Sequence, residues 1–130
     1  MSITSIYAAL VAFLFLVLSI RVIRVRHRTK IAFGAADDPG LERRIRVHGN
    51  FTEYVPFALL LIAFAESGGA PAWIVHALGL TLVLARVAHA YGVSQANENF
   101  RFRVFGTAST FGVVASAAIV ILFLVIAASH

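Results

Sequence analysis

The sequence predicts an all-α integral membrane protein, built as a bundle of four membrane-spanning helices. Of its 130 residues, 60% are hydrophobic and 13% are charged, whereas a soluble domain is typically about 45–50% apolar and about 25% charged. A hydrocarbon core of about 30 Å requires a helix of roughly 20 residues, so four spans with their connections fill the chain. We therefore expect one transmembrane domain over residues 1–130 and no separate soluble domain.

The four expected helices cover residues 3–25, 40–66, 72–91 and 104–128. No basic residue precedes the first apolar run, which is the reverse of a secretory signal peptide, so we expect this helix to be retained. Asp38 and Pro39 suit the cap and the first position of the second helix. Two glycines followed by Pro71 predict a tight turn before the third helix.

The third and fourth helices carry further positional signals. Trp73 and His76 stand at the start of the third helix, where an interfacial anchor belongs. The fourth helix has small residues at four-residue spacing, Ala108, Gly112 and Ser116, and this pattern is typical of a face that packs closely against another helix.

The distribution of charge predicts how the chain crosses the bilayer. All 11 lysines and arginines fall within residues 21–46 and 86–103, and with four spans both zones belong to one side. The positive-inside rule makes that side cytoplasmic and leaves both termini outside. Basic groups that face anionic headgroups explain part of the charge. We therefore expect membrane lipid, and no nucleic acid, as a partner.

A polar face on the second helix is the first sign of a functional site. Arg46, Asn50 and Glu53 share one helical face, and ionisable groups inside a membrane are costly unless they are paired. Arg86 follows a long apolar run in the third helix and is the expected partner of Glu53. An ion pair that holds the bundle together and a ligand site are compatible interpretations. The whole expected cluster comprises Arg24, Arg46, Asn50, Glu53, Arg86, His89, Tyr91, Arg101 and Arg103.

The residue types in this cluster favour a zwitterionic ligand with more than one carboxylate. Guanidinium groups bind carboxylates at two points, and a glutamate can bind an ammonium group. We expect no metal, because carboxylates are few and His48, His89 and Glu53 do not clearly share a face. Haem ligation by the two histidines rests on an unspecific spacing. Because the chain contains no cysteine, any thiol must come from a small molecule.

Two motifs resemble those of a known family. The run from Glu42 to Pro56 resembles the signature of the MAPEG superfamily, the membrane-associated proteins in eicosanoid and glutathione metabolism. Residues 86–91 resemble the third-helix motif of the same family. The length, the order of the helices and the basic loops also agree, and the second-helix motif looks like that of a bacterial member. The resemblance therefore implies a protein of a bacterial inner membrane.

The resemblance further implies a homotrimer that binds glutathione, or a similar thiol, as co-substrate between neighbouring subunits near the cytoplasmic face. The implied glutathione contacts are Arg24, Arg46, Asn50, Glu53, Arg86, His89 and Tyr91. An arginine at the start of the fourth helix would stabilise the thiolate, and Arg103 is the first candidate and Arg101 the second. The thiolate would attack a lipophilic electrophile or hydroperoxide.

Departures from the family pattern disfavour an assignment to prostaglandin or leukotriene synthesis. Gly49 stands where some eicosanoid-forming members have an arginine. Tyr91 follows His89 by two residues instead of four, and neither Arg101 nor Arg103 is followed by serine.

We therefore expect a glutathione-dependent membrane transferase or peroxidase, and two alternatives stay open. A small multidrug-type transporter also has four helices and a lone membrane glutamate. Such transporters carry that glutamate in the first helix, whereas Glu53 lies in the second. They also insert into the membrane in both orientations, which requires a nearly even distribution of positive charge, but here all 11 lysines and arginines belong to one side. The other alternative is a catalytically silent protein that binds lipid or thiol.

Overall fold

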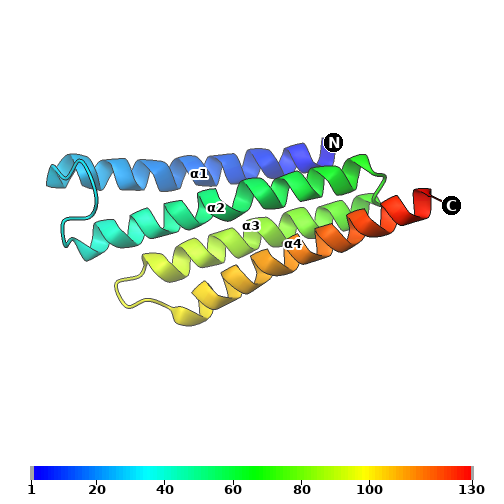
Figure 1. Ribbon diagram of the computed structural model, residues 1–130. Helices are drawn as coiled ribbons and strands as arrows, with labels where there is room; N and C mark the ends of the chain where they lie inside the picture. Colours follow the sequence, from blue (N-terminus) through cyan, green and yellow to red (C-terminus); the bar gives the residue numbers. More distant parts are fainter. Residues whose placement is uncertain (1, 130) are drawn as a thin grey trace.

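The computed structural model describes residues 2–129, which form four long helices and no strand. They are α1 (Ser2–Thr29), α2 (Pro39–Ser67), α3 (Ala72–Ser94) and α4 (Phe100–Ala128). Each is long and apolar enough to cross a membrane. Figure 1 shows an elongated up-and-down bundle in which both termini lie at the end that carries the α2–α3 turn. The predicted four-helix membrane architecture is confirmed.

Capping residues set where two of the helices begin. The Asp38 side chain accepts a hydrogen bond from the Leu41 N–H at 2.9 Å, and Pro39 follows as the first helical residue, as predicted. Asn99 caps α4 through a weaker contact of 3.4 Å with the Phe102 N–H. This cap starts α4 four residues earlier than the hydropathy indicates. Arg101 and Arg103, expected just before the helix, therefore lie in its opening turns.

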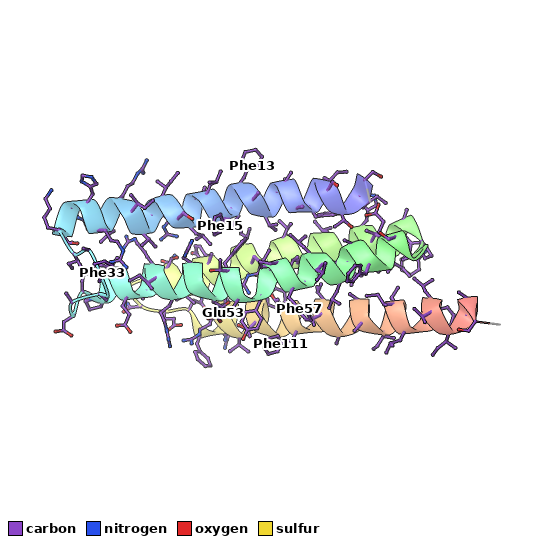
Figure 2. The ribbon with its side chains drawn as sticks, turned by 45° about the horizontal axis from the view of Figure 1, so that its top comes forward. Phe13, Phe15, Phe33, Glu53, Phe57 and Phe111 are labelled. Carbon is purple, nitrogen blue, oxygen red and sulfur yellow. The ribbon has the colours of Figure 1, made fainter. Side chains whose placement is uncertain are left out.

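The interior of the bundle consists of two apolar clusters. One joins α1, α2 and α3 through Val11, Leu18, Val47, Phe51, Val55, Ala90 and Val93. The other joins α2, α3 and α4 through Ala58, Ile62, Val75, Leu78, Leu82, Val113 and Ala117. Large apolar side chains also cover the outside, and Figure 2 shows Phe13 projecting away from the bundle. Such a surface suits contact with lipid rather than water.

Close helix contact on α4 involves a different face from the predicted one. Ala108, Gly112 and Ser116 are exposed, and an added Cβ at Gly112 would meet nothing within 4 Å. The contact with α3 occurs at Gly106, where a Cβ would lie 2.6 Å from the Ala85 carbonyl oxygen. Small residues at four-residue spacing mark a smooth face, and within this subunit that face points outward.

Polar contacts tie α1 to the other helices at the end where the termini lie. The Tyr7 hydroxyl contacts His76 Nδ1 at 2.8 Å. The Tyr7 ring also lies so close to Gly79 that a side chain at position 79 would collide with it. The Glu66 carboxylate accepts from the N–H groups of Ile3 and Thr4 at 3.0 and 2.8 Å. It thereby satisfies donors that the first turn of a helix leaves unpaired.

Candidate functional site

Two adjoining cavities lie toward the end of the bundle that carries the α1–α2 and α3–α4 connections. The first has a volume of about 510 Å³ and is formed by one face of α2 together with α3 and the start of α4. Its lining residues are Glu42, Arg43, Ile45, Arg46, Gly49, Asn50, Glu53, His89, Val93, Glu98 and Arg103. This size lies within the range of about 300–1,000 Å³ that is usual for small-molecule sites.

The second cavity, of about 470 Å³, runs along α4 and is more apolar. Its lining residues from α4 are Phe100, Arg103, Val104, Thr107, Ala108 and Phe111. Asn50, His89 and Arg103 line both cavities, and we call these three residues the junction. A molecule in either cavity could therefore touch the same three side chains.

The first cavity combines cationic and anionic side chains. Arg46 and Glu53, which the helical spacing places on one face, both line it and are exposed to it. Figure 2 shows Glu53 on the side of α2 that is turned toward α4. Arg43, one turn earlier on this face, also lines the cavity. The arrangement offers guanidinium groups for carboxylates and a carboxylate for an ammonium group.

The two candidate arginines of α4 differ in placement. Arg103 lines both cavities and forms an ion pair with Glu98 of the α3–α4 connection, with Nη1 2.8 Å from Oε1. Arg101 is exposed and lines neither cavity. Only Arg103 is therefore positioned to act at the junction within this subunit.

The predicted ion pair between Arg86 and Glu53 is wrong. Arg86 is 1% exposed and faces the interior between α2, α3 and α4, where its Nη2 donates to Asn50 Oδ1 at 2.6 Å. Its Nη1 donates to Thr110 Oγ1 at 3.3 Å. Glu53 lies on the exposed side of α2, so Asn50 takes the position expected for the glutamate. Arg86 also lines neither cavity.

The remaining predicted site residues divide between the junction and the surface. His89 is 4% exposed, lines both cavities, and has no hydrogen-bond partner for Nδ1 among the described residues. Tyr91 is 55% exposed and rests edge-on against Phe102, with ring centroids 5.4 Å apart. Arg24 is exposed on α1. Neither Tyr91 nor Arg24 lines a cavity of this subunit.

His48 and His89, considered above as haem ligands, have different surroundings. His48 Nε2 contacts the Ser19 hydroxyl of α1 at 3.0 Å, and its ring packs against Phe15. Because Ser19 donates its own proton to the Phe15 carbonyl, it accepts from the His48 N–H. His48 thus joins α1 to α2, whereas His89 lines the cavities.

Three residues of the site were absent from the predicted set. The helical spacing does place Arg43 on the same face as Arg46 and Asn50, one turn earlier, although Arg43 is not among the candidate residues. Glu98 belongs to a polar connection whose path the sequence does not specify. Thr110 stands within an apolar run, where a threonine usually bonds its own helix backbone, so no signal distinguished it.

Comparison with known proteins identifies the family. Residues 4–126 match the sequence model of the MAPEG family. Two relatives, both called inner membrane protein YecN, come from Escherichia coli strain K12 and from the O6:H1 strain CFT073. Each is 37% identical over 108 residues, covering 83% of this chain and 81% of the relative. The four apolar helices and these relatives indicate an integral inner membrane protein. The chain belongs to the MAPEG family.

Proposed function

We propose that this protein is a glutathione-dependent membrane transferase or peroxidase. Glutathione, or a similar thiol, occupies the first cavity, and a lipophilic electrophile or hydroperoxide occupies the second. The observation that carries the proposal is that the two cavities share the junction of Asn50, His89 and Arg103. A thiol held in one cavity and an electrophile held in the other would meet there.

The charges of the first cavity fit the polar groups of glutathione. Its two carboxylates can each bind a guanidinium group, for which Arg43 and Arg46 are available, and its ammonium group can bind Glu53. Arg103 then remains for the sulfur. This assignment uses each charged group of the tripeptide once and places the thiol nearest to the second cavity.

Arg103 is well placed to stabilise a thiolate. A free thiol has a pKa of about 8.5, and a nearby cation together with a helix N-terminus can lower it to about 7 or below. A shift of two units corresponds to roughly 3 kcal/mol. The Arg103–Glu98 pair is partly exposed, and such pairs are worth only about 0–1 kcal/mol. A thiolate can therefore displace Glu98 from Arg103 at little cost.

The second cavity suits a substrate that arrives through the lipid. Phe100, Val104 and Phe111 line it and are themselves exposed on α4. In transferase chemistry the thiolate sulfur bonds to an electrophilic carbon. Either a leaving group departs from that carbon with the electron pair of its broken bond, or a double bond at that carbon opens and its electron pair takes up a proton. In peroxidase chemistry two glutathione molecules supply two electrons, and the hydroperoxide becomes an alcohol and water while glutathione disulfide leaves.

A homotrimer, which the resemblance implies, would give Arg24 and Tyr91 a place at the site that they lack within one subunit. Both side chains are exposed and line neither cavity of their own subunit. They could contact glutathione only if a neighbouring copy brought them to its cavity. A head-to-tail contact that brings these side chains of one copy to the cavity of the next closes into a ring of identical subunits.

Thiolate formation tests the proposal directly. Glutathione added to the purified protein should produce the ultraviolet absorbance of a thiolate at neutral pH. Arg103→Ala should abolish this signal, and Arg101→Ala, the matched control two residues away, should retain it. Absence of the signal in the wild type, or an unchanged signal in Arg103→Ala, would contradict the mechanism.

A second measurement tests the orientation of the ligand. Glu53→Gln should weaken binding of glutathione, because the ammonium group loses its counter-charge. Binding of a glutathione analogue without the α-amino group should not change. If both ligands lose affinity equally, Glu53 does not bind the ammonium group.

A further inference from the structure

A chain of hydrogen bonds runs through the bundle interior from α4 to the junction. The Thr110 hydroxyl donates to the Gly106 carbonyl oxygen at 2.7 Å, so its oxygen is left to accept from Arg86 Nη1 at 3.3 Å. Arg86 Nη2 donates in turn to Asn50 Oδ1 at 2.6 Å. Thr110 is 0% and Arg86 1% exposed, so water does not compete for the two bonds of the Thr110 hydroxyl.

The chemistry of the guanidinium group determines which way the Asn50 amide points. Arginine can only donate hydrogen bonds, so the Asn50 atom that it contacts must be the oxygen. The amide nitrogen is then the polar atom left over for the cavities that Asn50 lines. An asparagine side chain could turn either its amide oxygen or its amide nitrogen toward the cavities. The contact with Arg86 makes Asn50 a hydrogen-bond donor there.

We propose that Thr110 and Arg86 are positioning residues that fix Asn50 as a hydrogen-bond donor at the junction of the two cavities. The inference rests on the proposed function and deepens it. The group that accepts from Asn50 is an anionic atom of the ligand, the thiolate or a carboxylate of glutathione. Arg86 thus acts on the ligand through Asn50 and does not touch it.

Arg86 is a buried polar residue that lines neither cavity, and its role as a positioning residue explains why it is there. Arg86 Nε has no hydrogen-bond partner among the described residues, so two side chains, Thr110 and Asn50, accept the hydrogen bonds of the guanidinium group, and its central carbon, Cζ, lies over the Phe51 ring, 6.0 Å from the centroid. Loss of the Thr110 hydroxyl removes one of these two anchors. The guanidinium group is then free to turn, and the Asn50 amide can rotate and present its oxygen, which repels an anion.

The orientation of Asn50 can be measured without any ligand. The chain has three asparagines, Asn50, Asn97 and Asn99, so labelling with ¹⁵N-asparagine gives three side-chain amide groups by NMR, each seen as a pair of N–H signals at one nitrogen frequency. In Thr110→Val the Asn50 signal should shift while the two loop asparagines stay unchanged, and Thr110→Ser should restore it. An Asn50 signal that is the same in Thr110→Val and in the wild type would overturn the proposal.

A matched control separates this effect from a general loss of helix structure. Thr52 also bonds its own helix, donating to the His48 carbonyl oxygen at 2.6 Å, but it is exposed and lines neither cavity. Thr52→Val therefore removes the same kind of hydroxyl without touching Arg86. It should leave the Asn50 signal where it is, and an equal shift in both variants would count against a specific role for Thr110.

Glutathione titration gives the second readout. Thr110→Val should weaken binding about tenfold, which corresponds to about 1.4 kcal/mol. Asn50→Asp, which keeps an acceptor for Arg86 but has no N–H to donate, should fold and lose at least as much affinity. Wild-type affinity in Asn50→Asp would overturn the inference, even if Thr110→Val failed to fold. If the wild type bound no glutathione, the proposed function would fail. The amide signal would still decide whether Thr110 and Arg86 fix the orientation of the Asn50 side chain.

Discussion

Replacement of Gly106 by alanine tests how closely α4 must approach α3 for the site to form. A Cβ at this position would lie 2.6 Å from the Ala85 carbonyl oxygen, 2.6 Å from His89 Cβ and 2.8 Å from His89 N. Ordinary contact begins at about 3.4 Å. Two of the three obstructing atoms belong to the backbone and the third is attached to it, so no side-chain rotation relieves the clash. The helices must move apart.

The magnitude follows from two opposing effects. Overpacking of this kind costs about 1–3 kcal/mol, and exchange of glycine for alanine within a helix gains about 0.8–1 kcal/mol. Gly112→Ala on the same helix has the gain without the clash, because nothing lies within 4 Å of its added Cβ. The gain in helix propensity is the same in both variants and therefore cancels when their free energies of unfolding are compared. Gly106→Ala should therefore be less stable than Gly112→Ala by about 1–3 kcal/mol.

Reversible unfolding in mixed micelles, followed by circular dichroism, measures this difference. Since the clash involves His89, which lines both cavities, Gly106→Ala should also diminish the thiolate signal, and Gly112→Ala should not. Equal stability of the two variants would refute the argument, because it would mean that α3 and α4 do not approach as closely as described.

Three further predictions concern the opposite end of the bundle and the topology. Tyr7→Phe should lose about 0.5–1.5 kcal/mol of unfolding free energy with its bond to His76 and keep the affinity for glutathione, measured by calorimetry. Glu66→Ala should destabilise the bundle by about 0.5–2 kcal/mol, because two N–H groups at the start of α1 lose their acceptor. In this cysteine-free chain, an impermeant maleimide added to intact cells should label Ser67→Cys and not Asn97→Cys, and the reverse pattern would contradict the positive-inside assignment.

The membrane spans and the α2 boundary could be predicted because they depend on local properties of the chain. Hydropathy over about 20 residues decides whether a helix crosses a bilayer, and Asp38 with Pro39 forms a cap whatever else surrounds it. Hydropathy predicts a late start for α4, because its cap, Asn99, stands in a polar stretch. The polar side chain, and not the start of the apolar run, decides where that helix begins.

Contacts between helices were harder to predict, because they depend on how each helix is rotated about its axis. The small-residue pattern at Ala108, Gly112 and Ser116 describes a smooth face correctly but does not specify what the face touches. The expected pairing of Arg86 with Glu53 rests on opposite charge and on the place of both residues near the same end of their helices. Asn50 is one turn from Glu53 on α2, and a modest rotation of that helix decides which of them meets the guanidinium group.

The outcome of that rotation has an electrostatic consequence. Arg86 is a buried cation whose hydrogen-bond partners, Asn50 and Thr110, are neutral, and the described residues provide no carboxylate in contact with it. A buried charge is costly unless an opposite charge compensates for it. Asn50, which accepts from Arg86, also lines both cavities. An anion bound there would supply the missing counter-charge, and the empty site would be left less stable for lack of it. With Glu53 as its partner, Arg86 would already be neutralised, and the junction would attract an anion less strongly.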